Sequence, residues 1–411
     1  MPAAPLLPEL HPDVVAALGI GTTTPVPQDE EAAFHQKDRP VLFGDDVIDC
    51  AHGLLNIARN AKTLIGAPTI PKIDAPAIAI GGGPSLNAHL PALRALQHKC
   101  LLVCSQTSLA GLLKEGITPH YCTPMERNQY MEKYTPADCG DVIFAGSPLC
   151  HPDVVNRFKR HRWVPSADDV MKWVNIPGES QVFFGSSTGT TAVNVAAFSA
   201  WKSKVYLVGH DLSYSDTNSH WSGSMAVKYD PEKATEWCLG NNGEKLRTEA
   251  FWRRLSGQIT DTTLLHPGLI NVNAHYGIGA KIAGVGSGPL PDPDSLPDFV
   301  LPDAAPCPER LRSWKKAARM LLTHANRLDR FFQQIKHITP EETDIRRVDL
   351  GKNVHAFSYL LVSLMVQFSY DMRMQSITPQ QGLEWLKEST HSVLKHCRGM
   401  LRQIQELAEA A

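Results

Sequence analysis

The chain has 411 residues, a formal net charge of −2 at neutral pH and an apolar fraction of 43%. This length allows two or three domains with a proper core, and the small net charge gives no overall field that would favour nucleic acid or an anionic membrane. Nine cysteines are scattered singly, which favours a reduced compartment over a disulfide framework. No apolar run reaches the length of a bilayer span, and prolines interrupt the N-terminus. We therefore expect a cytoplasmic protein without membrane insertion and without a nucleic-acid partner.

Residues 1–72 form the first predicted segment, which is rich in proline up to Pro40. A helix is predicted over residues 46–63, because Val47, Ala51, Leu54, Leu55 and Ala58 share one face. That apolar face predicts packing against the following domain.

Residues 73–290 alternate between short apolar runs and helical patterns. This alternation predicts a three-layer, Rossmann-like α/β domain with a mostly parallel sheet. In such sheets, ligands bind beyond the carboxyl ends of the strands. The predicted strands are residues 77–80, 101–104, 120–123, 142–145, 162–164, 204–208 and 269–272.

A glycine-rich loop follows the first predicted strand, with Gly81, Gly82 and Gly83 ahead of Ser85 and a helical pattern. Glycines let a backbone approach a ligand closely, and the free N–H groups of a helix start favour an anion, so the loop indicates a nucleotide or phosphorylated ligand. A dinucleotide fingerprint would need a third glycine at the position of Leu86, and the lysine of a P-loop is missing. A tight turn without a ligand remains the alternative.

A second glycine and hydroxyl segment contains Ser187, Thr188 and Gly189 and precedes a helix with many small residues. Hydroxyl groups and backbone amides at that helix start could hold another polar or phosphate group. An N-cap followed by close helix–sheet packing explains the same pattern, and both can hold together.

His210 and Asp211 follow the predicted strand at 204–208, and His220 lies in a polar loop shortly after them. Because histidine titrates near neutral pH, His220 could accept a proton from an attacking hydroxyl. The three residues do not have a known metal-ligand spacing, although a divalent ion there stays an alternative. Other strands end in polar residues that we expect at the same rim, namely Ser105, Gln106 and Glu126.

Residues 284–306 are rich in glycine and then in proline, which predicts a linker over residues 291–306. Three helical patterns follow and predict an all-helical bundle domain over residues 307–411. The basic run from Arg310 to Arg319 is expected to be a solvated helix face or an acceptor surface.

The order of these motifs carries a family resemblance. Gly81–Leu86, Ser187–Gly189, the strand that ends in Gly209–Leu212, and Asn218–His220 resemble the motility-associated factor (Maf) proteins. These proteins share the DUF115 domain, which is similar to that of 6-hydroxymethylpterin diphosphokinase. The same order resembles bacterial sialyltransferases of glycosyltransferase family 42. The resemblance covers roughly residues 73–285, and Asn273 lies in an Asn-Ala segment that is also similar to Maf proteins.

The resemblance implies a transferase that moves a nonulosonic acid of the sialic, pseudaminic or legionaminic type from its CMP-activated form to an acceptor hydroxyl. In Maf proteins the acceptor is flagellin Ser or Thr, which implies a role in bacterial motility. A CMP-sugar is a substrate and leaves with one phosphate, so no cofactor or metal is required.

The resemblance also implies a role for each motif. Gly81, Gly83 and Ser85 would hold the nucleotide, while Thr188 and Gly189 would stabilise the departing phosphate. His220 would act as base, with His210 and Asp211 beside it. Gly82 stands where the sialyltransferases often have Asn, so backbone contacts would replace a side-chain contact.

Two other functions stay open. A pterin-type pyrophosphokinase would use ATP and Mg²⁺, and Glu126 and Asp211 would be available to hold the metal. A non-catalytic nucleotide-sugar-binding protein would not need His220.

Overall fold

The computed structural model describes residues 56–57, 59–127, 129–166, 175–176, 179–215, 218–225 and 236–315. Within the chain, Arg59–Ser313 forms one compact unit, which is wider than the predicted domain of residues 73–290. Most of the predicted N-terminal helix and the helical patterns beyond Lys315 lie outside the described residues.

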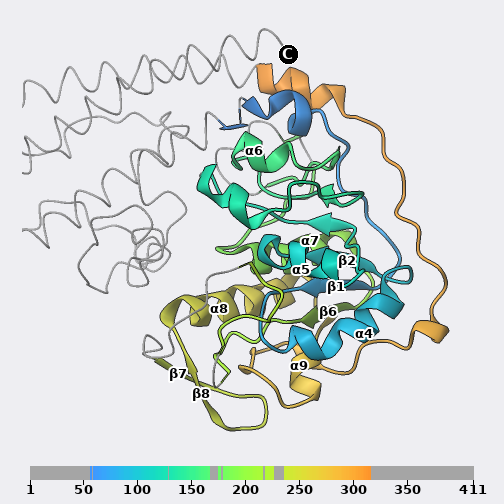
Figure 1. Ribbon diagram of the computed structural model, residues 1–411. Helices are drawn as coiled ribbons and strands as arrows, with labels where there is room; N and C mark the ends of the chain where they lie inside the picture. Colours follow the sequence, from blue (N-terminus) through green and yellow to red (C-terminus); the bar gives the residue numbers. More distant parts are fainter. Residues whose placement is uncertain are drawn as a thin grey trace, which may run out of the picture. The chain divides into compact units, whose positions relative to one another are not determined.

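The centre of this unit is an eight-stranded parallel sheet in the order β10-β9-β6-β1-β2-β3-β4-β5 (Figure 1). The predicted Rossmann-like α/β class is therefore confirmed. The strands are β1 (Ala77–Ile80), β2 (Leu101–Cys104), β3 (Tyr121–Cys122), β4 (Ile143–Phe144), β5 (Arg160–His161), β6 (Val205–Val208), β9 (Leu269–Asn271) and β10 (Gly286–Ser287).

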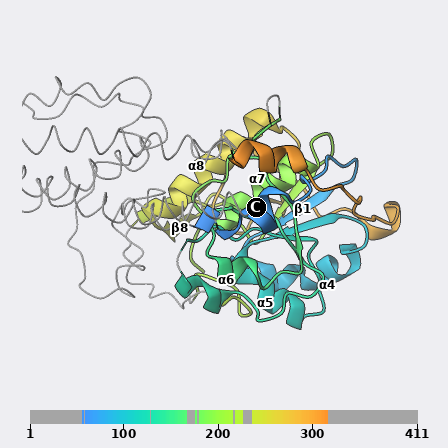
Figure 2. The same cartoon turned by 90° about the horizontal axis from the view of Figure 1, so that it is seen from above.

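Successive side chains of the central strands point to opposite faces of the sheet. Both sets are apolar, and helices cover both faces. Ile78 and Ile80 of β1 pack into a cluster with α4 (Leu86–Leu96) and α5 (Gln106–Lys114). On the other face, Ala77 and Ala79 pack with α7 (Thr188–Ser199) and α8 (Ala250–Leu265). Figure 2 shows these two helix pairs on opposite sides of β1. Both faces of the central strands β1, β2 and β6 are thus buried, which leaves the ends of these strands as the place for a ligand.

The small residues of α7 are explained by its position over the middle of the sheet. Ala192, Val193 and Ala196 are completely buried. Small side chains let the helix axis lie close to the strands, which agrees with the predicted close helix–sheet contact.

The shorter helical elements connect these layers. They are η1 (Ala61–Ile65), η2 (Gln129–Tyr134), α6 (Pro152–Val155), α9 (Val272–His275) and η4 (Pro293–Ser295). Within the described residues, no helix combines the length and hydropathy needed to cross a membrane.

Three features of the sheet region differ from the sequence prediction, and the first is the short edge strand β10, which was not predicted. The strand predicted at residues 162–164 lies at Arg160–His161, and Trp163 instead bridges to Thr69. An antiparallel hairpin of β7 (Glu236–Leu239) and β8 (Lys245–Thr248) was not predicted. Its strands alternate only weakly in hydrophobicity because both faces are partly exposed, so the period-two signal is faint.

The segment predicted as a linker lies against the α/β unit. The backbone N–H of Phe299 donates to the carbonyl of His98 at 2.7 Å, and Lys99 pairs with Asp298 at 2.8 Å. Leu296 packs against the core on the α4 side. Proline prevents regular structure in this segment, and specific side-chain contacts hold it in place.

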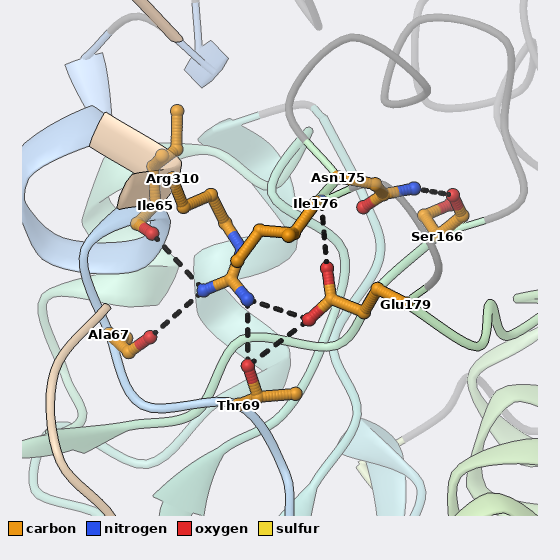
Figure 3. Close-up of polar contacts among 8 residues, drawn as sticks. All are labelled: Ile65, Ala67, Thr69, Ser166, Asn175, Ile176, Glu179 and Arg310. Carbon is orange, nitrogen blue, oxygen red and sulfur yellow. Dashed lines mark hydrogen bonds and ion pairs between the residues drawn. The ribbon is translucent and has the colours of Figure 1, made fainter. Parts of the chain in front are cut away.

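Arg310 fastens the end of this segment to the start of the domain (Figure 3). Its guanidinium is fully buried, donates to the carbonyls of Ile65 and Ala67, and pairs with Glu179 at 2.7 Å. The ring of Trp163 lies 5.0 Å from the guanidinium carbon. Arg310 belongs to the basic run predicted as a solvated face, so that prediction is wrong for this residue.

Candidate functional site

The candidate site lies where β1 and β6 run side by side. The chain leaves β1 toward β2 on one side, whereas β6 is added on the other, which makes this pair the topological switch point. Ile80 and Val208 are register partners at the ends of the two strands. The loops that leave them, Gly81–Ser85 and Gly209–Asp211, therefore meet at the edge where such folds bind ligands.

The first loop needs glycine at positions 81 and 83 because the second loop, Gly209–Asp211, packs directly against its backbone. The N–H groups of Gly81 and Gly83 donate to the carbonyls of Val208 and Gly209, each at 2.8 Å. A Cβ on Gly83 would overlap the carboxylate of Asp211 and lie 2.8 Å from the Gly209 carbonyl. These two N–H groups are thus unavailable to a phosphate, which differs from the predicted role of Gly81 and Gly83. The close approach that needs glycine is between two protein loops.

Asp211 occupies the N-terminus of α4. Its carboxylate accepts the backbone N–H of Ser85 at 2.8 Å and a short hydrogen bond from the Asn273 amide. The Ser85 hydroxyl donates to the Asn273 carbonyl oxygen at 3.0 Å. Burial raises the pKa of Asp211, while its bonds to Ser85 lower it. All three side chains are buried, so they position the loops rather than contact a substrate.

His210 is also inside the protein. Burial lowers the pKa of its imidazole to about 4. Its ring lies 3.7 Å from where a Cβ on Gly189 would be, so it supports the start of α7 from below. His210 was predicted beside the base His220, and the structure describes it as a buried residue near the start of α7.

The turn after β6 adopts an uncommon backbone conformation. Gly209 has φ +69° and Leu212 has φ +47°, in the left-handed region that is unfavourable for leucine. The Thr248 hydroxyl donates to the Leu212 carbonyl at 2.8 Å, so the hairpin holds the turn. Non-glycine residues in this conformation cluster at functional sites.

His220 lies directly over the glycine loop. The N–H of the next residue, Trp221, donates to the Gly82 carbonyl at 3.0 Å, and His220 Cδ2 is 3.3 Å from where a Cβ on Gly82 would be. His220 Nδ1 lies 2.9 Å from the Ser219 hydroxyl. Burial lowers the pKa of His220 to about 4. The imidazole is consequently neutral at pH 7 and able to accept a proton.

Gly82 lines the open part of the loop. The positions around its missing side chain are taken by His220, the Ser108 hydroxyl and the Thr107 hydroxyl. Among the residues that the structure describes, the N–H of Gly82 has no acceptor. Gly82 is thus the glycine of this loop whose amide remains available to a ligand.

The polar residues at the end of β2 are used within the protein. Ser105 and Ser108 are within hydrogen-bonding distance at 2.9 Å, and the Ser108 hydroxyl donates to the Gly81 carbonyl at 3.0 Å. Gln106 is completely buried and donates to Thr135 at 2.8 Å. Ser105 and Gln106 are therefore buried and bound to other protein groups, not exposed at the end of the strand. Sequence reasoning missed Ser108, although its position one turn after Ser105 was the available signal.

The N-terminus of α7 differs from that of α4 because no carboxylate of the described residues accepts its first N–H groups. Ser187 and Thr190 form a capping box, with the Thr190 N–H donating to the Ser187 hydroxyl at 3.1 Å. The N–H groups of Thr188 and Gly189 have no acceptor in the described part of the chain, and both residues are partly exposed. The Thr123 hydroxyl fixes the Thr188 carbonyl at 2.9 Å to the end of β3. This helix start is open to an anionic group.

Glu126 and Asn273 lie in two different surroundings. Glu126 follows β3, and its carbonyl accepts the N–H of His151 at 3.1 Å. Burial raises the pKa of Cys150, which lies beside α6, and the negative charge of Glu126 raises it further. Asn273 belongs to the cluster under the glycine loop. Within the described residues, no group of three or more His, Cys, Asp and Glu side chains could hold a metal ion.

The parallel sheet, its switch point and the open helix start define a Rossmann-like α/β protein whose candidate ligand site lies at the ends of β1 and β6. Residues 52–217 match the model of the 6-hydroxymethylpterin diphosphokinase MptE-like family. This match agrees with the DUF115 resemblance of the sequence motifs.

The fold is similar to that of a solved structure described as a Maf glycosyltransferase from Magnetospirillum magneticum AMB-1. The TM-score is 0.51 at 16% sequence identity, over 89% of this chain and 61% of that protein. This chain therefore matches less than two thirds of that protein's length, and the likeness concerns the fold. A comparison with curated proteins found no match.

Proposed function

We propose that this chain is a glycosyltransferase that moves a nonulosonic acid from a CMP-activated donor to an acceptor hydroxyl. The observation that carries the proposal is the pairing of an open helix start at Thr188–Gly189 with a neutral histidine, His220, at one switch point. The acceptor proposed is a protein hydroxyl, with flagellin Ser or Thr as the first candidate. The likeness to a Maf glycosyltransferase supports this reaction class.

The donor side of the reaction uses α7. The N–H groups of Thr188 and Gly189 lie at the positive end of a 12-residue helix. As the glycosidic bond to CMP breaks, negative charge grows on the leaving phosphate, and fixed N–H donors there lower the barrier. The N–H of Gly82 adds a further donor from the facing loop. One phosphate needs less charge compensation than a diphosphate.

The acceptor side uses His220. Its imidazole takes the proton of the acceptor hydroxyl while the hydroxyl oxygen attacks the anomeric carbon, and CMP departs with the electrons of the broken bond. The lowered pKa keeps the base unprotonated at neutral pH. The Ser219 hydroxyl orients the ring through Nδ1. A positioned base of this kind contributes on the order of 10²–10⁴-fold to a rate.

The pyrophosphokinase alternative takes support from the description of the matching family. It needs carboxylates that bind Mg²⁺ and a triphosphate. Asp211 is engaged by Ser85 and Asn273, which leaves it poorly placed for that role.

A thermal-shift panel with CMP, CDP, UDP and ATP, each with and without Mg²⁺, separates the three functions. Stabilisation by CMP without metal is expected for the transferase, because a ligand that binds the folded state raises its melting temperature. A response to ATP only with Mg²⁺ would identify the kinase. CMP binding without release of CMP from any CMP-sugar and hydroxyl acceptor would leave the non-catalytic binding protein.

A further inference from the structure

The N-termini of α4 and α7 both lie near the switch point. They differ in whether a side-chain carboxylate accepts their first N–H groups. The start of α4 holds the carboxylate of Asp211, which accepts the Ser85 N–H at 2.8 Å. The start of α7 holds no side-chain anion, and the N–H groups of Thr188 and Gly189 have no acceptor among the described residues. Glycines precede both helix starts and hydroxyl residues lie at them, so the sequence pattern by itself favours a phosphate at each.

The seat of Asp211 is closely fitted around its carboxylate. Each carboxylate oxygen accepts one hydrogen bond, from Ser85 and from Asn273. Gly83 leaves room for the carboxylate, and Gly279, with φ +72°, would place a Cβ 3.0 Å from the Asp211 backbone. The whole residue Asp211 is only 4% exposed, so a substrate does not reach its carboxylate.

We propose that Asp211 is a positioning residue that acts as an internal anion, filling the start of α4 and directing the phosphate of a bound nucleotide to the start of α7. Two anions at one helix end would repel each other, so a ligand phosphate is excluded from α4 while Asp211 stays there. The choice of α7 rests on the proposed nucleotide function, whereas the filling of α4 does not.

The arrangement also explains how the two loops keep their shape without a ligand. Asn273 donates to Asp211 and accepts from the Ser85 hydroxyl, which closes a ring of three hydrogen bonds. The ring joins β6, α4 and α9. These hydrogen bonds fix the two loops relative to each other, so nucleotide binding would not have to order them.

The test removes the internal anion and offers a replacement. Asp211→Ala leaves the Ser85 N–H without an acceptor, and we expect a lower melting temperature that sodium formate restores in a saturable way, relative to sodium chloride at equal ionic strength. Inorganic phosphate is larger than the carboxylate that fits this seat, so it is expected to restore less stability than formate. If the variant folds poorly in chloride, the yield of folded protein with formate is the same measurement.

Asp138→Ala is the matched control, because Asp138 also accepts a backbone N–H, from Gly140 at 2.8 Å, but in an exposed turn. Formate should leave this control unchanged. Asp211→Asn should also be destabilised, since an amide cannot accept from both donors. In Asp211→Ala we expect CMP affinity to fall about tenfold, the equivalent of one hydrogen bond, and to recover with formate.

Two outcomes would overturn the proposal. The first is a folded Asp211→Ala variant that responds to neither formate nor phosphate. The second is an Asp211→Asn variant that equals the wild type in stability and CMP affinity. If wild-type protein does not bind CMP but the formate response appears, the proposed function fails while the internal anion stands.

Discussion

The carboxylate of Asp211 accepts the backbone N–H of Ser85 at 2.8 Å, across 126 positions of sequence. This bond joins the loop after β6 to the loop after β1, the two loops that border the candidate site. It also means that the most conspicuous anion site in the sequence already contains an anion. The site for a ligand phosphate is consequently expected at α7.

Replacing His220 tests the proposed base. His220→Gln should lower the transfer rate by about 10²–10⁴-fold with CMP affinity within about twofold, because glutamine fills similar space but cannot take a proton. Steady-state kinetics and calorimetric titration with CMP check the two effects. His275→Gln is the control, since His275 is an exposed histidine on α9. Equal activity of His220→Gln and wild type would remove His220 from the reaction.

The pH profile of transfer gives an independent check on His220. Burial lowers its pKa to about 4, so the base should remain unprotonated well below pH 6.5. The acid limb of kcat/KM is therefore expected near pH 4 to 5. An acid limb centred at pH 6.5 would show that the imidazole is solvated, against the structure.

A carboxylate placed at the start of α7 should block the donor. A Cβ on Gly189 meets only ordinary contacts, at 3.6 Å from the Ser187 hydroxyl and 3.7 Å from His210. Gly189→Asp should therefore fold, with an acidic side chain near a helix N-terminus favourable by about 0.3–1 kcal/mol. CMP affinity should fall at least about tenfold through repulsion of the phosphate. Gly189→Asn, of the same size and neutral, should bind CMP more tightly than Gly189→Asp.

Alanine substitutions at Gly82 and Gly83 should differ in their effect on the free energy of unfolding. Gly83→Ala should destabilise the protein by about 1–3 kcal/mol, because the added methyl overlaps Asp211 and the Gly209 carbonyl. Gly82→Ala should cost less than about 1 kcal/mol, since its nearest neighbours lie 3.3 Å and 3.4 Å away and include the movable His220 ring. Urea denaturation measures both. A Gly82→Ala variant less stable than Gly83→Ala would contradict this loop geometry.

Stability should rise with pH through the mildly acidic range. Burial lowers the pKa of His120, His210 and His220 to about 4 each, whereas unfolded histidine titrates near 6.5. Between these values the unfolded chain binds more protons, so the free energy of unfolding increases from about pH 4 to about pH 6.5. The raised pKa of Asp211 makes stability fall with rising pH, but the three histidines together outweigh this single carboxyl group. Melting temperatures that stay flat from pH 4.5 to 6.5 would contradict the burial of these histidines.

Two arginines on one helix should differ sharply in their effect on stability. Arg310→Ala should cost about 3–5 kcal/mol, because it leaves Glu179 without its positively charged partner and two buried carbonyls without their donor. Arg312→Ala should change stability by less than about 0.5 kcal/mol, since its pair with Glu309 is exposed. Thermal and urea unfolding of both variants make the comparison. Similar losses in the two variants would show that the cluster in Figure 3 is not a major anchor.

Much of the fold followed from local patterns. The strands at Ala77–Ile80 and Leu101–Cys104 were predicted to the residue, because each is a four-residue apolar run buried on both faces and followed by glycine or serine. The hairpin at Glu236–Leu239 and Lys245–Thr248 escaped prediction, since its half-exposed strands lack a clear alternation. The buried role of Arg310 was equally invisible, because its partners lie far away in sequence.

The sequence by itself determined the parallel α/β class and the set of polar residues at the strand ends, because the period of apolar residues and the position of glycines are local properties. Only the tertiary structure decided how those residues are used. It turned Asp211 inward onto Ser85, placed His210 under the sheet edge, and left His220 beside Gly82. The reason is that hydrogen-bond partners and burial depend on which strands become neighbours, and a linear pattern does not specify those distances.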